Sequence, residues 1–158
     1  MKTQLDPSKI RIKTSTISIG KIIERIKDNS ILFNYNNTWS IDKQSHLIES
    51  LLVRIPLPSF CIDASNYEKW VIINGFQRLN SIKCFVLDDS ILKQNEQDKL
   101  YLTNLEYLDD LNGKTFDTLE RHLQRRIETT DVVVYFIDEG VSNDVKLNLY
   151  KIFHTDIK

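Results

Sequence analysis

Residues that mark special classes of protein are scarce in this 158-residue chain. Its four glycines and three prolines are too few for a collagen-like or low-complexity chain. Its two cysteines, Cys61 and Cys84, lack Cys-x-x-Cys spacing, which argues against a disulfide scaffold and against a zinc finger. The three histidines share no ligand-type spacing, so the sequence predicts no metal site.

Long apolar segments are also lacking. No run approaches the roughly 18 residues that a membrane-spanning helix needs, and no leader-like pattern opens the chain. We therefore expect a cytoplasmic protein without membrane contacts. With 41% hydrophobic and 27% charged residues, the composition is that of a globular protein, and the length fits one domain.

The expected domain begins near residue 15. Residues 1–14 are polar and basic and are expected to form an extended lead-in, followed by a single domain over residues 15–158. The sequence stops while its last predicted helix, which carries Ile152 and Phe153, is still apolar. This pattern suggests that a partner protein or a missing C-terminal region covers that helix.

The formal net charge of -1 conceals an asymmetry between the two halves of the chain. Residues 1–79 carry 11 basic and 7 acidic side chains, whereas residues 80–158 carry 10 basic and 15 acidic ones. A basic footprint for nucleic acid over the whole domain is therefore excluded, and we expect any DNA contact to be indirect or weak. Arg121, Arg125 and Arg126 form a local basic patch that either meets DNA or is simply solvated.

Hydrophobic spacing predicts two helices in the first third of the chain. Ser18 caps the first, whose apolar residues recur at helical spacing from Ile19 to Ile26. The second follows Ser40, and its buried stripe is Leu47, Ile48, Leu51 and Leu52. This helix must stop before Pro56.

The remaining segments alternate between strand and helix patterns. Strands are expected at 59–63, at 70–73 and, buried on both faces, at 132–137, with short additional strands within 100–102 and 105–111. Helices are expected from Gln77, over 118–129, and after a cap at Ser142.

The most informative segment is a strand followed at once by a glycine and a helix, at Asn74-Gly75-Phe76-Gln77-Arg78. A helix N-terminus after a strand presents unpaired backbone N–H groups and the positive end of the helix dipole. Gly75 allows close approach of a ligand, and Arg78 can offer a planar fork to phosphate oxygens. Alternatively, this is an ordinary turn whose arginine pairs with a neighbouring carboxylate.

Several blocks of sequence resemble a known family. Residues 18–23 match its opening helix, and Trp39 to Gln44 lead into 47–58, which is close to the family's LIESLLxGxPxP signature. Residues 70–79 stand where the family has a strand and an Asp-Gly-Gln-Gln-Arg-Leu turn. Further blocks follow in order at 111–116, 132–137 and 152–153. Over residues 15–155 the chain thus resembles the N-terminal domain of GmrSD-type modification-dependent restriction endonucleases, within the ParB/sulfiredoxin-like superfamily.

The resemblance implies an α+β (mixed α/β) fold, a ParB/sulfiredoxin-like domain with a small mixed sheet and packed helices. It also implies that the domain binds a nucleoside triphosphate beside this turn, with Mg²⁺. In active relatives the motif supports nucleotide hydrolysis, coupled to the cleavage of phage DNA by a separate nuclease part. Carried over residue by residue, the nucleotide or phosphate site is Asn74, Gly75, Gln77 and Arg78. Gln77 is the candidate catalytic residue, because a glutamine can orient attacking water.

Two further residues follow from the resemblance as supporting positions. Trp39 begins the block before the second helix, and Glu49 lies within that helix. Glu49 either forms a salt bridge with Arg78 or Arg54, or faces solvent.

The chain departs from the family pattern at its charged positions. Asn74 replaces the motif aspartate, Phe76 replaces the first glutamine, and the family's Gln-Arg pair before the tryptophan is missing. The family's Phe-x-Arg-x-Asn motif would fall on 153–157, where arginine and asparagine are both absent. These departures predict weakened phosphate binding and loss of hydrolysis by the family mechanism. They also exclude sulfiredoxin chemistry, which needs a cysteine where Phe76 stands.

Three functions therefore remain open. The first is a nucleotide- or phosphate-binding module of a phage-defence system, catalytically weakened or inactive, whose partner is a nuclease or another defence protein. The second is a non-catalytic protein-interaction domain on the same scaffold. Direct nuclease activity ranks last, because no cluster of carboxylates or histidine stands near the expected groove.

Overall fold

The structure is a computed structural model that describes residues 8, 11–33, 38–94, 96–138 and 140–155. In chain order its elements are β1 (Ile12–Ser18), α1 (Ile19–Lys27), β2 (Ile31–Leu32), α2 (Ile41–Leu52), β3 (Phe60–Asp63), β4 (Trp70–Asn74), α3 (Phe76–Val86), α4 (Asp89–Gln94), the 3₁₀ turns η2 (Asp109–Leu111) and η3 (Phe116–Thr118), α5 (Arg121–Glu128), β5 (Asp131–Ile137) and α6 (Asn143–Thr155).

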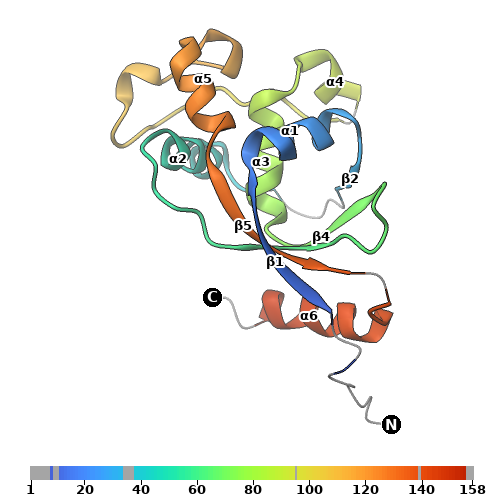
Figure 1. Cartoon of the computed structure of the whole chain (residues 1–158). Helices are drawn as coiled ribbons and strands as arrows, with labels where there is room; N and C mark the ends of the chain where they lie inside the picture. Colours follow the sequence, from blue (N-terminus) through green and yellow to red (C-terminus); the bar gives the residue numbers. More distant parts are fainter. Residues whose placement is uncertain (1–7, 9–10, 34–37, 95, 139, 156–158) are drawn as a thin grey trace.

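The strands form one mixed sheet with the order β1-β5-β3-β4-β2. β1 pairs antiparallel with β5, β3 runs parallel to β5 and antiparallel to β4, and β2 runs parallel to β4. Figure 1 shows most helices gathered on one side of the sheet, with α6 alone on the other. The predicted α+β fold is confirmed.

Each side of the sheet has its own apolar cluster. The larger one joins the sheet to the helical layer, and Ile48, Leu51, Phe60 and Leu79 are among its fully buried members. The smaller one packs α6 against the sheet through Cys61, Ile73, Ile137, Val141 and Val145. In the described part of the chain, no helix has the length and apolarity needed to cross a membrane.

Local signals in the sequence predicted several elements correctly. Ser18 and Ser40 cap α1 and α2, each accepting a backbone N–H at 3.2 Å. The strands expected at 59–63 and 70–73 form the antiparallel hairpin β3–β4. Ser142 accepts the Val145 N–H at 3.4 Å at the start of α6. The asparagine-rich stretch at 34–37 lies outside the described residues.

The predicted lead-in ends in a strand. From Ile12 the chain pairs with the whole of β5, so the expected boundary between residues 14 and 15 falls within β1. The prediction that β5 is buried on both faces was wrong. Val133 and Tyr135 are 42% and 38% exposed, because α6 covers the half of the sheet that contains β3 and β4.

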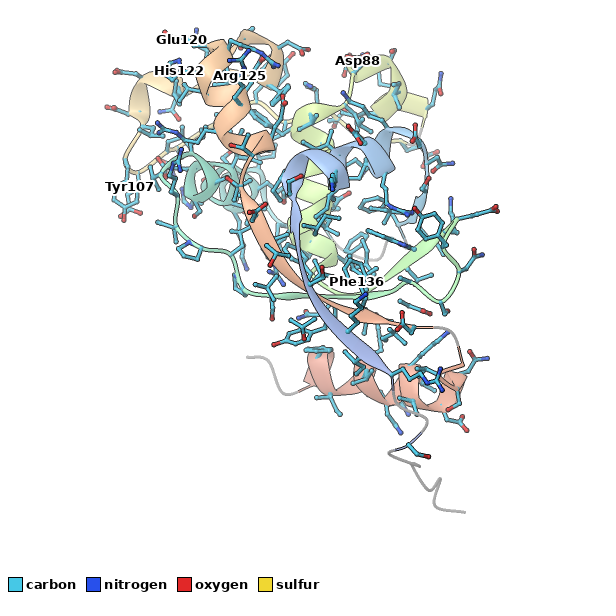
Figure 2. All side chains as sticks on the ribbon, in the orientation of Figure 1. Asp88, Tyr107, Glu120, His122, Arg125 and Phe136 are labelled. Atoms are coloured by element: carbon cyan, nitrogen blue, oxygen red, sulfur yellow. The ribbon has the colours of Figure 1, made fainter. Side chains whose placement is uncertain are left out.

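The short strands expected within 100–111 do not form; this segment contains no strand. Side chains satisfy its backbone instead: Ser45 Oγ accepts the Thr103 N–H at 3.1 Å, and Asn112 Oδ1 accepts the Leu105 N–H at 3.0 Å. Figure 2 shows the acidic residues Asp88 and Glu120 at the end of the molecule away from α6.

Candidate functional site

A groove of about 930 Å³ opens where β4 ends and α3 begins. Segments that are distant in sequence line it: β2, the segment before α2, α2 itself, the connector to β3, β4 with the turn to α3, and α6 on the other side of the sheet. Its walls are Leu32, Trp39, Leu47, Ser50, Ile55, Pro56, Leu57, Pro58, Ile72, Ile73, Asn74, Gly75, Phe76, Gln77, Arg78 and Tyr150. The structure thus brings Trp39 together with the four motif positions.

Gly75 makes the abrupt change from strand to helix. Its φ of 109° lies in the region that favours glycine, and it caps α3 without a side chain. The backbone passes so close to Phe60 that a Cβ on residue 75 would lie 2.2 Å from the ring. Glycine is therefore required here for both conformation and space, independently of any ligand.

Arg78 is held beside the connector. Its Nη1 donates to the carbonyl of Pro58 and its Nη2 to the carbonyl of Ser59 at 3.1 Å, while the guanidinium lies over the Phe60 ring at 4.1 Å. Burial lowers the pKa of Arg78 to about 10. Among the described residues, no carboxylate lies within ion-pair distance of this guanidinium. The alternative in which Arg78 pairs with a carboxylate is therefore not realised.

Gln77 bonds to the protein backbone. Its Oε1 accepts the N–H of Trp39 at 3.0 Å, which ties the start of α3 to the segment before α2. On the other side, Nε2 of the buried Gln44 donates to the Trp39 carbonyl at 2.8 Å. The Trp39 ring is half-buried at the groove, and the Lys43 ammonium lies 4.5 Å from its centre.

The groove has cationic and amide groups but no acidic wall. None of the described residues that line it is aspartate, glutamate or histidine, and Asn74 stands at the position of the family's carboxylate. No group of three or more His, Cys, Asp or Glu that could hold a metal ion occurs in the described ranges. The described lining thus combines one guanidinium, amide groups and apolar walls, without a carboxylate or imidazole that could serve as a general base.

Residues 34–157 match the family described as "GmrSD restriction endonuclease, N-terminal domain". The chain belongs to this family. Neither the curated proteins nor the solved structures gave a match. Apart from Leu32, every residue that lines the groove lies within the region that matches the GmrSD N-terminal domain.

Glu49 is not part of the groove, which corrects both expectations for it. It forms no salt bridge with Arg78 or Arg54, and it does not face solvent, being 3% exposed. Its carboxylate accepts the backbone N–H groups of Glu106, Tyr107 and Leu108 at 2.8–3.1 Å. Burial alone would raise the pKa of Glu49, but these donors outweigh it, and the pKa lies below its ordinary value of 4.5. Figure 2 shows Tyr107 at the outer edge of this loop.

Sequence reasoning missed several residues of the groove. Tyr150 reaches it from α6, and its place in the periodic pattern of that helix gave no sign of this role. Ile55 and Leu57 were placed from sequence only within the 47–58 signature, and in the structure they form one wall of the groove. Phe76 was treated as a departure from the motif; in the structure it adds an aromatic wall, with its ring centre 6.0 Å from that of Phe33.

The two cysteines are unsuited to redox or nucleophilic chemistry. Both are buried and free, and burial raises the pKa of each thiol to about 11. A thiol with that pKa is almost entirely protonated near pH 7, and the thiolate is the reactive form. Both cysteines therefore behave as small residues of the protein interior.

Proposed function

We propose that this domain binds a nucleoside triphosphate in the groove beside the β4–α3 turn and does not hydrolyse it by the family's motif mechanism. The observation that carries the proposal is the state of Arg78. Its charge is partly desolvated at the groove, and burial without a compensating carboxylate depresses its pKa. Buried charges in proteins are normally paired, so an anion that enters the groove would supply the missing counter-charge.

The shape and lining of the groove support a nucleotide over a bare phosphate ion. A volume of about 930 Å³ is within the usual range of small-molecule sites. Two of Arg78's hydrogen bonds go to carbonyl oxygens, and a guanidinium has five N–H donors, so others remain for phosphate oxygens. The aromatic and aliphatic walls suit the planar, less polar part of such a ligand.

The donor set does not fit a magnesium ion held by the protein. Mg²⁺ in nucleotide sites is usually bound by one or two carboxylates together with the substrate phosphates. The groove supplies an amide at Asn74 and a hydroxyl at Ser50, but no carboxylate. Binding in this domain therefore does not depend on Mg²⁺, and the carboxylate that would hold metal or accept a proton for hydrolysis is missing.

The domain would act within a larger defence system. Family membership as the N-terminal domain of a restriction endonuclease supports a nuclease part, in the same protein or in another, as its partner. The exposed apolar residues Leu147 and Ile152 of α6 give such a partner a surface to cover. Cytoplasmic location and membership of the ParB/sulfiredoxin-like superfamily remain predictions.

Thermal denaturation with each of the four NTPs, with inorganic tripolyphosphate, and with and without Mg²⁺ tests the proposal. At about 100 times Kd, binding stabilises the native state by about 2.7 kcal/mol, or roughly 5–10 °C for a domain of this size. Arg78→Gln should abolish the shift. Arg126→Gln is the matched control, because Arg126 also donates to a backbone carbonyl, that of Leu52 at 3.1 Å, and does not line the groove.

Both variants are expected to lower the melting temperature of the free protein, since each loses a side chain bound to the backbone. The NTP-dependent shift should persist in Arg126→Gln alone. Absence of a shift with every ligand, or an undiminished shift in Arg78→Gln, would contradict the proposal.

A second candidate is the non-catalytic protein-interaction domain, which the apolar connector favours. Ile55 is 47% exposed, and with Leu57 and two prolines it forms a rigid apolar wall. This candidate predicts that a hydrophobic segment of a partner occupies the groove and that no NTP stabilises the domain.

A further inference from the structure

The backbone of Trp39 is fixed from both sides by glutamine side chains. Gln77 Oε1 accepts its N–H at 3.0 Å, and Gln44 Nε2 donates to its carbonyl at 2.8 Å. Gln77 comes from the first turn of α3 and Gln44 from the first turn of α2, so two helices hold one residue. Gln44 is 8% exposed and does not line the groove.

The ring of Trp39 is also held in place, by a contact with Lys43. The Lys43 ammonium lies 4.5 Å from the ring centre, a cation–π arrangement that occupies one face. The Lys43 backbone is itself anchored, because its N–H donates to Ser40 Oγ at 3.2 Å. Trp39 also lines the groove. A planar ligand that stacks on the ring would therefore need the face that Lys43 does not cover.

From this arrangement we infer that Trp39 is the stacking platform for the base of the bound nucleotide, and that Gln77 and Gln44 are positioning residues that hold it. The inference rests on the proposed function. It reassigns Gln77, because the side-chain oxygen that could orient a water accepts the Trp39 N–H. Arg78 and Trp39 border the same groove, so one ligand can place its phosphates at the first and its base at the second.

Stacking on an indole has a consequence for specificity. Every nucleobase has a π face, so stacking on an aromatic side chain discriminates little between bases. Loss of the aromatic partner typically weakens binding about 5- to 150-fold. We therefore expect the four NTPs to bind with similar affinities, purines somewhat more tightly. Inorganic tripolyphosphate, which has no base, should bind more weakly than any of them.

Fluorescence of Trp39 in the Trp70→Phe background tests the inference. The protein has two tryptophans, and Nε1 of Trp70 is buried without a hydrogen-bond partner among the described residues, so phenylalanine there removes no hydrogen bond. In this background NTP should quench the Trp39 emission, and tripolyphosphate should leave it nearly unchanged. Trp39→Leu should weaken NTP binding about 5- to 150-fold while leaving tripolyphosphate binding intact.

Gln44→Met separates positioning from direct contact. It removes the donor to the Trp39 carbonyl at a residue outside the groove, so it should alter Trp39 emission in the free protein and weaken NTP but not tripolyphosphate binding. Gln77→Glu, which keeps an acceptor for the Trp39 N–H, should keep the emission of the free protein.

The outcomes distinguish the inference from the function on which it rests. NTPs that stabilise the protein without changing Trp39 emission would overturn the stacking platform and leave nucleotide binding standing. Equal affinity for NTP and tripolyphosphate in the native protein would likewise overturn the stacking platform, because the base would then add nothing to binding. Absence of both a thermal shift and an emission change with every ligand would overturn the proposed function and the inference together.

Discussion

Gly75 and Phe60 are in such close contact that a methyl group on the glycine would lie 2.2 Å from Cδ1 of the ring. Phe60 is fully buried, and the guanidinium of Arg78 lies over the same ring. The turn, the first strand residue of β3 and the arginine therefore form one packed unit. This unit fixes the edge of the groove before any ligand arrives.

Gly75→Ala should destabilise the protein by about 3 kcal/mol, since unfavourable backbone strain adds to overpacking against Phe60. Gly113→Ala is the matched control. Gly113 also has positive φ, 84°, but nothing lies within 4 Å of a Cβ there, so about 1 kcal/mol is expected from strain alone. Urea denaturation of both variants measures the difference in stability. Equal midpoints would show that the contact with Phe60 adds no destabilisation when residue 75 carries a methyl group.

Glu49→Gln should destabilise the domain by about 2 kcal/mol at pH 7, because an amide cannot accept three N–H donors as a carboxylate does. The pKa of Glu49 is lower folded than unfolded, so its stabilisation is complete above about the ordinary value of 4.5 and is lost as pH falls through the folded value. The difference in unfolding free energy between the two proteins should therefore shrink in acid. A difference that stays constant down to pH 2 would refute this role.

Local signals in the sequence predicted the parts of this fold that local physics determines. Serine caps, apolar spacing and the Gly75 turn each involve neighbouring residues, and α1, α2 and the β4–α3 unit were predicted from them. Pairing of β1 with β5 joins residues more than a hundred positions apart, and no local pattern near Ile12 indicates this pairing. The role of Glu49 was missed for the same reason, because its partners are backbone groups 57 to 59 residues away.

In the candidate site too, the sequence predicted the local motif but not the contacts with distant segments. The motif positions 74, 75, 77 and 78 were placed from sequence through a resemblance, and the structure gathers them on one groove with Trp39. The bonding of Arg78 to Pro58 and Ser59 was not predictable, because any exposed carbonyl can accept from an arginine. Tyr150 could not be placed, because α6 reaches the groove from the opposite side of the sheet.

Lys146→Met should loosen α6 and, through Tyr150, one wall of the groove. Lys146 Nζ lies 3.0 Å from Asp63 Oδ2 and donates to Ser65 Oγ at 2.8 Å, with the ion-pair side chains 19% and 11% exposed. We expect a loss of about 2 kcal/mol, between the values for exposed and fully buried ion pairs. Faster hydrogen exchange of the α6 amides is the readout.

The control for that variant is Lys93→Met. Lys93 and Asp89 also form an ion pair at 3.0 Å, but both side chains are more than half exposed, and we expect no measurable change. If Lys146→Met exchanged α6 amides no faster than Lys93→Met, the ion pair with Asp63 would not be what holds the helix.

Asn74→Asp should convert Mg²⁺-independent nucleotide binding into Mg²⁺-dependent binding. A carboxylate in the groove repels the phosphates, which should weaken NTP affinity roughly tenfold in the absence of metal. With Mg²⁺ present, the carboxylate gains a counter-ion and affinity should recover. Calorimetric titration with and without Mg²⁺ measures both arms; unchanged affinity in the metal-free arm would place the phosphates away from residue 74.

The most direct test of nucleotide binding at this groove is a ¹H–¹⁵N correlation spectrum of the labelled protein during titration with NTP. If the nucleotide binds in the groove, the Gly75, Gln77 and Arg78 amides and the Trp39 indole N–H should show saturable shifts, while the buried Trp70 indole should not move. Shifts confined to another surface, or a spectrum that does not change with any NTP, would contradict binding at this groove.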